Sequence, residues 1–271
     1  MTTAPTPTDG HPLALVTGAS AGIGYQLALQ LAQAGYDLVV TGRSEAVADA
    51  ATDFEECGVQ VRGVRADLTR YDEVDGVWHA VVDTGRPLDV AVLNAGVSLG
   101  GAFVDTDLQD ELDLISLNVT SVVHLAKHVV RHMAARRRGR ILITSSISAT
   151  KPTPFETVYG PSRAFTHMFA QGLREELKDV GVSVTALLPG ATDSEFHARA
   201  GMDNTAFGPG MRKNSRVEVA RQGIEALLAG KDQVVAGDRA TRRAAIRNRF
   251  ARETAKAARH ARKARPRPSD D

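Results

Sequence analysis

The sequence predicts one doubly wound α/β domain, in which helices cover both faces of a seven-stranded parallel sheet. The chain has 271 residues, which fits one large α/β domain, and 43% of them are hydrophobic, which is enough to fill its core. Short apolar runs alternate with stretches of helical periodicity, as expected for parallel strands joined by helices.

The expected strands are short apolar runs flanked by turn-forming residues, and they cover residues 13–17, 37–41, 59–64, 88–93, 139–144, 181–188 and 233–235. The expected helices carry apolar residues at helical spacing, and they cover residues 22–34, 44–57, 70–83, 112–137 and 155–179. All seven strands fit one sheet, so the domain spans residues 13–238 without a second unit.

Three segments fall outside this alternation. Residues 1–12 are rich in Thr and Pro, and we expect them to be flexible. Residues 195–216 lack clear periodicity, so we expect a mobile loop beside the sheet, where a substrate lid would lie. Residues 239–271 form a tail rich in Ala and Arg, whose composition fits either helix or disorder.

Charge is segregated along the chain. Residues 239–271 hold 12 basic and 3 acidic residues, whereas the rest of the chain holds 21 basic and 29 acidic ones. Phe250 is the only aromatic residue of the tail, which argues against binding of single-stranded nucleic acid. We expect a solubilising extension. An arm that clasps another subunit is the second interpretation, and contact with nucleic acid or anionic lipid is the third.

A soluble cytoplasmic protein is expected. Cys57 is the only cysteine, which excludes an internal disulfide and suits a reducing compartment. The apolar runs are well short of the roughly 20 residues of a membrane span. The N-terminal residues lack the basic and apolar regions of a secretion signal.

A glycine-rich turn follows the first expected strand and leads directly into a helix; the candidate ligand contacts in it are Gly18, Ser20, Gly22, Ile23 and Gly24. Glycine has no Cβ and tolerates positive φ, so a ligand can approach the backbone, and the helix start offers unpaired N–H groups. A pyrophosphate fits such a turn. A tight turn without a ligand is the alternative.

Further motifs follow the ends of later strands, and they are Leu93-Asn94-Ala95-Gly96, Ser145-Ser146, Tyr159 and Pro189-Gly190. Together with the Gly-x3-Gly-x-Gly spacing, they resemble the short-chain dehydrogenase/reductase family over about residues 13–237. The resemblance implies a Rossmann-type domain and an NAD(P)-dependent oxidoreductase of a carbonyl or secondary alcohol. It also implies a homodimer or homotetramer.

The turn after the second strand decides the expected cofactor. It has no acidic residue at Thr41 or Gly42 to bind a free ribose 2′-hydroxyl. By resemblance, Arg43 stands where NADP-preferring members carry a basic residue, and a guanidinium grips a phosphate with paired donors. We therefore expect NADP(H), with NAD(H) as the alternative. A solvated arginine at a helix start is the interpretation without a ligand.

The resemblance implies the remaining cofactor contacts, which are Asp67, Leu68, Asn94, Ala95, Gly96, Pro189, Gly190 and Ser194. Ser194 takes the place of the usual Thr near the nicotinamide carboxamide. For others a structural role is the alternative, because Asp67 suits a helix cap and Gly190 suits a strand end.

The catalytic residues implied by the resemblance are Tyr159, Arg163, Ser146 and Asn118. A phenol serves as an acid–base group near neutral pH only when a cation stabilises its phenolate, and Arg163 lies four residues later on the same helix face. Ser146 would bind the substrate oxygen, and Asn118 would bend its helix and hold a water of the proton relay.

Arg163 departs from the family, which carries lysine at this position. Arginine keeps the positive charge and the donors for the nicotinamide ribose, but it is bulkier and does not readily release a proton. A reductase of reduced rate is one interpretation. The other is a cofactor-binding protein with little turnover, whose basic tail recruits a partner.

Three histidines, His124, His128 and His132, repeat every four residues on one expected helix. This spacing suits metal ligands, but no acidic residue or Cys accompanies them in the sequence. We therefore expect no metal, and a helix that packs against another subunit.

Overall fold

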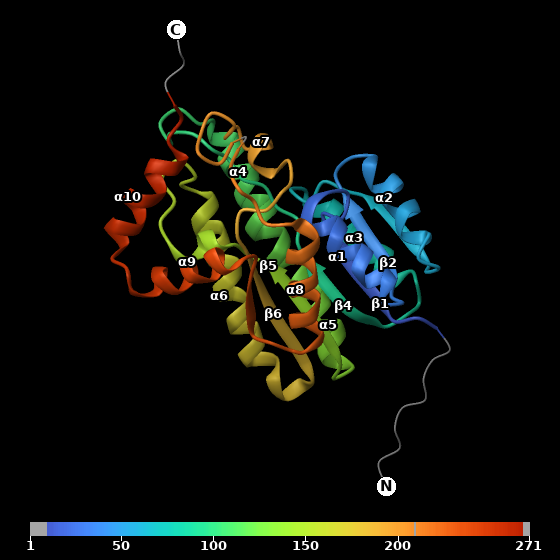
Figure 1. Ribbon diagram of the computed structural model, residues 1–271. Coiled ribbons are helices and arrows are strands. Elements are labelled where there is room, and N and C mark those ends of the chain that lie inside the picture. Colours follow the sequence, from blue (N-terminus) through green and yellow to red (C-terminus); the bar gives the residue numbers. More distant parts are fainter. Residues whose placement is uncertain (1–9, 209, 268–271) are drawn as a thin grey trace.

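The computed structural model describes residues 10–208 and 210–267, which form a central sheet between two layers of helices (Figure 1). The sheet has the strand order β3-β2-β1-β4-β5-β6-β7, and all pairs are parallel. Its strands are β1 Leu13–Thr17, β2 Asp37–Gly42, β3 Val61–Arg65, β4 Leu88–Leu93, β5 Gly139–Thr144, β6 Val182–Pro189 and β7 Gln233–Ala236. The predicted fold class is confirmed. Most of the N-terminal segment, residues 1–9, lies outside the described residues.

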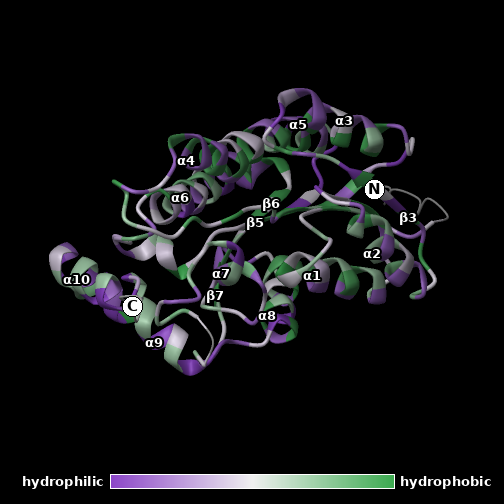
Figure 2. Cartoon of the chain, turned by 90° about the horizontal axis from the view of Figure 1, so that it is seen from above, coloured by the Kyte–Doolittle hydropathy of each residue, from purple (hydrophilic) through white to green (hydrophobic). Residues whose placement is uncertain are grey.

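The helices are α1 Gly22–Gln33, α2 Ala46–Glu55, α3 Tyr71–Val82, α4 Leu108–Ile115, α5 Ser121–Ala135, α6 Tyr159–Leu177, α7 Phe196–Arg199, α8 Arg216–Leu228, α9 Arg239–Phe250 and α10 Glu253–Ala264. Helices α3 to α6 cover one face of the sheet, and α1, α2 and α8 cover the other (Figure 2).

Side chains of successive strand residues enter opposite cores, as the pleat requires. In β1, Leu13 and Leu15 join the core beneath α3, α5 and α6, whereas Ala14 and Val16 join the core beneath α1, α2 and α8. Burial on both faces explains why the strands are near-continuous apolar runs rather than alternating ones.

The strand order reverses at β1, which lies between β2 and β4. The chain therefore runs outward from β1 to β3 and then crosses to β4 on the other side. In doubly wound sheets, ligands bind at the carboxyl ends of the strands beside this reversal. The motifs identified in the sequence follow strand ends at this edge, except Tyr159, which begins α6.

Two helical regions differ from the sequence prediction. The single helix expected over residues 112–137 is divided by a π-helical turn, Ser116–Thr120, between α4 and α5. Helix α8 was not expected, although a capping-box pattern marks its start: the Ser215 hydroxyl accepts the N–H of Glu218.

The basic tail is folded over its described residues, up to 267, rather than disordered. Its helices α9 and α10 lie on the side of the sheet that the later strands, β5 to β7, form (Figure 1).

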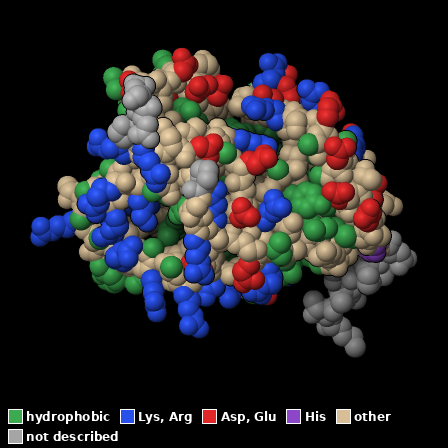
Figure 3. All heavy atoms as spheres, turned by 45° about the horizontal axis from the view of Figure 1, so that its top comes forward, with side chains coloured by type: hydrophobic (Ala, Val, Ile, Leu, Met, Phe, Trp, Pro, Cys, Tyr) green, Lys and Arg blue, Asp and Glu red, His purple; other side chains and the backbone are tan. Residues whose placement is uncertain are grey.

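No helix in the described ranges is long and apolar enough to cross a membrane. Lys and Arg side chains gather on one side of the face shown in Figure 3, and acidic side chains are more frequent on the other.

Candidate functional site

The glycine turn is shaped by contacts within the protein. Gly18 and Gly22 have positive φ angles of 68° and 61°. A Cβ on Gly18 would lie 2.9 Å from the Cα of Ala95, and one on Gly24 would overlap the carbonyl oxygen of Gly18. Glycine is therefore required here by backbone conformation and close packing within the protein.

The loop after β4 is tied to its neighbouring strands. The hydroxyl of Thr17 accepts the N–H groups of Asn94 and Ala95 at 2.9 and 3.0 Å. The Asn94 amide donates to the Thr17 carbonyl at 3.1 Å and accepts from the Thr144 hydroxyl at 3.1 Å. Asn94 thus joins the ends of β1, β4 and β5, and its side chain has a structural role.

The adenosine end of the expected cofactor site holds a second arginine. Arg43 is exposed at the end of β2. The Nε of Arg65, which ends β3, donates to the Arg43 carbonyl at 3.3 Å, and its Nη1 lies 2.6 Å from Glu45 Oε1. The sequence analysis missed Arg65, because only the pairing of Arg65 with Gly42 across two strands brings it here.

Asp67 and Leu68 contact the protein in different ways. Asp67 Oδ1 accepts the N–H and the hydroxyl of Thr69 at 3.0 and 2.8 Å, whereas α3 begins after Arg70. Asp67 therefore forms a turn before the helix instead of capping it. The Leu68 side chain is buried in the core, which leaves its backbone for any contact with a cofactor.

The structure brings Tyr159 and Arg163 together at the start of α6. The Arg163 Cζ lies 5.3 Å from the centroid of the Tyr159 ring, and its Nη1 donates to the Thr144 carbonyl at 3.2 Å. Arg163 is only 3% exposed, and its Nε has no hydrogen-bond partner in the described part of the chain. A buried N–H without a partner indicates a missing acceptor.

The two serines after β5 have separate roles. The Ser145 hydroxyl donates to the Arg163 carbonyl at 2.7 Å, so it supports the helix. Ser146 Oγ accepts the N–H of Ser148 at 3.1 Å, which leaves the proton of that hydroxyl available to donate. Ser146 therefore lies beside Tyr159 with a hydroxyl that can donate, and its predicted role at the substrate oxygen stays a prediction.

Burial raises the pKa of Tyr159 above that of a free phenol, against the charge of Arg163 and the Ser146 hydroxyl, which lower it. The charge of Glu156 adds to the increase. This differs from the sequence expectation of a lowered pKa, because the loss of hydration outweighs the nearby guanidinium.

Asn118 lies in the π-helical turn and is fully buried. Its Oδ1 accepts the N–H of Val97 at 2.9 Å. Its Nδ2 donates to the Val97 carbonyl at 2.9 Å and to the Ser162 hydroxyl at 3.0 Å. Ser162 in turn donates to the carbonyl of Tyr159 at 2.7 Å. Asn118 therefore fixes the loop after β4 against the first turn of α6.

Gly96 lies directly against the arginine. A Cβ at this position would overlap Nη2 of Arg163 and lie 2.7 Å from Oδ1 of Asn118. The guanidinium thus occupies the space that any larger residue at position 96 would need.

The strand end after β6 is packed beneath the tail. A Cβ on Gly190 would lie 2.6 Å from the Thr241 hydroxyl and 2.8 Å from Nδ2 of Asn214. Pro189 is the last paired residue of β6. Ser194 lies near the glycine turn, since a Cβ on Gly22 would be 3.6 Å from the Ser194 Cβ.

The described part of the segment 195–216 lies beside Tyr159 through Phe196 and shares a small core with the tail. The ring of Phe196, in α7, lies 5.6 Å from the ring of Tyr159. Ala200, Met202 and Phe207 are buried together with Ala264 of α10. The position over Tyr159 suits the predicted lid.

The tail contributes a buried polar network next to Tyr159. His260, on α10, is 2% exposed; its Nε2 lies 2.9 Å from Glu156 Oε2 and its Nδ1 lies 2.9 Å from Lys151 Nζ. A lysine can only donate, so Nδ1 accepts and Nε2–H donates to the carboxylate. Burial lowers the pKa of Lys151 to about 8 and also lowers that of His260. The solubilising extension expected from composition is instead an integral part of the fold.

Known proteins were compared with this chain. The sequence profile of the short chain dehydrogenase family matches residues 12–205. An uncharacterized short-chain type dehydrogenase/reductase of Sinorhizobium fredii is 35% identical over 195 residues, which are 72% of this chain and 75% of the relative.

Solved structures resemble the whole domain. The short-chain dehydrogenase of Sphingobium yanoikuyae, solved in complex with NADPH, is 30% identical with a TM-score of 0.77, and the match covers 83% of this chain and 87% of the other. The bulky-bulky ketone specific alcohol dehydrogenase of Comamonas testosteroni is 27% identical with a TM-score of 0.74, covering 83% and 85%.

The contact between Gly96 and Arg163 yields a first prediction. Gly96→Ala forces the guanidinium or the loop to move, so we expect a loss of about 1–3 kcal/mol in the free energy of unfolding. Denaturant unfolding measures this loss. Gly172→Ala is the matched control on α6, because its Cβ would meet nothing within 4 Å. It should be neutral or stabilising by up to about 1 kcal/mol. Equal stability of the two variants would contradict this packing.

The tail network yields a second prediction. His260→Ala leaves the buried Glu156 and the partly buried Lys151 without their shared partner, so we expect a destabilisation of about 1–3 kcal/mol in denaturant unfolding. Phe250→Ala, at a position of α9 that is 85% exposed, should change stability by less than about 0.5 kcal/mol. An unchanged midpoint for His260→Ala would show that the tail is not docked in this way.

Proposed function

Since the chain belongs to the short-chain dehydrogenase family, we propose that it transfers a hydride between NADP(H) and a carbonyl compound or the corresponding secondary alcohol. The observation that carries this proposal is the buried Arg163 guanidinium beside the Tyr159 ring, with its Nε unpaired among the described residues. A ribose hydroxyl of a bound nicotinamide nucleotide is an acceptor of the kind that this Nε lacks.

The protein's part of the reaction is to protonate and orient the substrate oxygen. A bound nicotinamide would supply the hydride. Tyr159 donates its phenolic proton to the oxygen, and the Ser146 hydroxyl donates a hydrogen bond to the same atom. Arg163 is permanently charged and stabilises the phenolate that remains.

The raised pKa of Tyr159 favours the protonated phenol. A protonated phenol is the form needed to reduce a carbonyl, whereas oxidation of an alcohol needs the phenolate.

Asn118 acts as a positioning residue in this scheme. Both amide hydrogens and its oxygen are used by Val97 and Ser162. The side chain therefore holds the loop and α6 in place.

The preference for NADP(H) rests on two guanidinium groups at the ends of β2 and β3. Arg43 is free of ion pairs among the described residues, and Arg65 lies beside it with Glu45 as partner. Two neighbouring arginines suit a ribose 2′-phosphate better than a hydroxyl. The NADPH complex of the Sphingobium yanoikuyae relative supports the same cofactor.

The substrate side has an aromatic wall, since the Phe196 ring lies 5.6 Å from the Tyr159 ring. Bulky apolar ketones are the first class to test, as the specificity of the Comamonas testosteroni enzyme also suggests.

Exposed apolar side chains on α4 and α6 support the homo-oligomer implied by the resemblance, and they are Leu108, Leu112, Phe165 and Met168.

A second candidate function is cofactor binding with little turnover. The observation in its favour is Arg163 itself, which hydrogen-bonds the Thr144 carbonyl and does not release a proton to a relay. In this case NADPH would bind tightly while no carbonyl compound would be reduced.

A third prediction separates the two functions. Tyr159→Phe removes the proton donor, so we expect kcat for ketone reduction with NADPH to fall about 100- to 10,000-fold, while the Kd for NADPH stays within about threefold. Steady-state absorbance measures the first quantity, and NADPH fluorescence measures the second. Equal rates for Tyr159→Phe and the unmodified protein would exclude Tyr159 as the acid. Tight NADPH binding without turnover of any ketone by the unmodified protein would favour the second function.

A fourth prediction concerns the cofactor phosphate. Arg43→Ala should raise the KM for NADPH by about tenfold or more and leave the KM for NADH nearly unchanged, because only NADPH carries the 2′-phosphate. Arg62→Ala is the control on β3: Arg62 bonds the Ala80 carbonyl and pairs with Asp83. Parallel increases of both KM values in Arg43→Ala would rule out a phosphate contact.

A further inference from the structure

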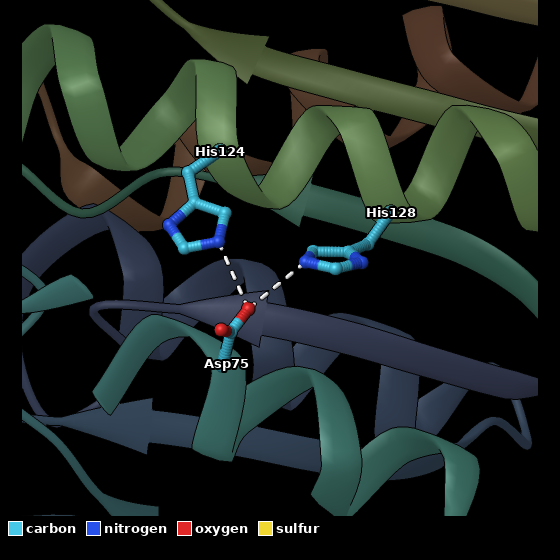
Figure 4. Close-up of side chains that lie close together, drawn as sticks. All are labelled: Asp75, His124 and His128. Carbon is cyan, nitrogen blue, oxygen red and sulfur yellow. Dashed lines mark hydrogen bonds and ion pairs between the residues drawn. The ribbon is translucent and has the colours of Figure 1, made fainter. Parts of the chain in front are cut away.

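A cluster of two histidines and one aspartate joins α3 to α5, on the helical layer away from α1 and α8 (Figure 4). Nε2 of His124 lies 2.9 Å from Oδ1 of Asp75, and Nε2 of His128 lies 3.0 Å from the same oxygen. The three ligand atoms all lie within 4.8 Å of one another. Each residue therefore turns a potential metal ligand toward one point between the two helices.

The fold supplies the acidic group that is not adjacent to the histidines in the sequence. Asp75 precedes His124 by 49 residues and reaches it only because α3 packs beside α5. His124 and His128 share one face of α5, and this face meets α3. The predicted contact of this helix with another subunit stays a prediction. The sequence-based argument against a metal, the absence of an acidic partner, does not hold in the folded protein.

His132 is excluded from the cluster by its own contacts. Its Nε2 accepts the N–H of Leu88 at 3.2 Å and lies 3.4 Å from Nη1 of Arg136. The Nε2 lone pair is already used by the Leu88 N–H, and the positive charge of Arg136 lies nearby, so His132 is a poor metal ligand. The third histidine of the series therefore anchors the start of β4, and only the first two remain for a ligand.

Aromatic neighbours hold the two imidazoles in place. The Tyr71 ring stacks on His124 with centroids 4.1 Å apart, and the Trp78 ring stacks on His128 at 5.4 Å and 15°. The side chains of the cluster are 11%, 29% and 32% exposed for His124, His128 and Asp75. Rings that are already oriented and partly shielded lose little freedom when a metal binds.

We propose that His124, His128 and Asp75 bind a divalent transition-metal ion of the Zn²⁺ type. Imidazole nitrogen and carboxylate oxygen are the ligands that Zn²⁺ takes at about 2.0–2.2 Å, and three protein ligands leave a fourth position for water. Ligand atoms around a tetrahedral ion at that distance lie about 3.3 Å from one another. The distances from Asp75 Oδ1 to the two Nε2 atoms, now 2.9 and 3.0 Å, would therefore lengthen by only about 0.3 Å. The ion replaces the imidazole protons that now face the carboxylate.

The site would have a structural role, in which the ion links α3 to α5. His124 lies six residues after Asn118, about 9 Å further along the helix axis, so the ion would not touch the reacting atoms. It would hold α5 against α3 close to the π-helical turn. Asn118 lies in this turn and positions the loop after β4. Metal binding would therefore stabilise the native state, by an amount that grows with the logarithm of the ratio of free Zn²⁺ concentration to Kd.

The test uses the full chain without an affinity tag, first treated with a chelator. Calorimetric titration with ZnCl₂ should show one equivalent bound, and the melting temperature should rise with the Zn²⁺ concentration. Co²⁺ should give the visible absorption bands of a tetrahedral site. Asp75→Asn, which keeps the shape of the side chain, and His128→Ala should each weaken Zn²⁺ binding at least about tenfold.

His79→Ala is the matched control, because His79 is an exposed histidine on α3 outside the cluster. It should bind Zn²⁺ as the unmodified protein does. The double variant with His124→Ala and His128→Ala should no longer bind one equivalent of Zn²⁺. Its NADPH binding reports whether it is folded. Absence of a bound equivalent, or equal Zn²⁺ affinity in that double variant, would overturn the proposal and leave the cluster as an ion pair.

Discussion

The burial of one guanidinium organises the candidate site. Arg163 carries a permanent charge at 3% exposure, and such a group is costly to bury unless its donors find partners. The Thr144 carbonyl and the Tyr159 ring provide two of these partners. Gly96 makes room for the group, since its missing side chain leaves the space that the Nη2 occupies. Strand β5, the loop after β4 and α6 are thus fixed to each other through one side chain.

This arrangement explains why arginine can stand where the family carries lysine. A guanidinium has a fixed fork of donors, so one edge can bond the Thr144 carbonyl while Nε remains for a second acceptor. Lysine would bring a single ammonium to the same place. The substitution therefore keeps the positive charge and an unpaired donor, which under the proposed function would bind the ribose, but it gives up an easily transferred proton. The raised pKa of Tyr159 agrees with a site in which the phenol keeps its proton.

Local sequence signals predicted the sheet and its site-bearing edge, because buried parallel strands are apolar runs and the motifs, except Tyr159, directly follow them. They were weaker where structure depends on distant contacts. Arg65 reaches Arg43 only through strand pairing, and Asp75 reaches His124 only through helix packing. The start of α8 was different: the Ser215 and Glu218 pattern was present in the sequence, but the stretch before it lacks periodicity.

The tail shows why composition alone misjudged a segment. Twelve basic residues suggested a solvated extension, yet α10 places Lys256, His260 and Ala264 four residues apart on one buried stripe. A stripe of this kind is invisible to a hydropathy pattern, because two of its members are polar. Their partners are an inward-facing carboxylate, Glu156, and a backbone carbonyl, that of Thr150. The described part of the basic arm therefore docks on its own domain, where His260 contacts Glu156, three residues before Tyr159 in the sequence.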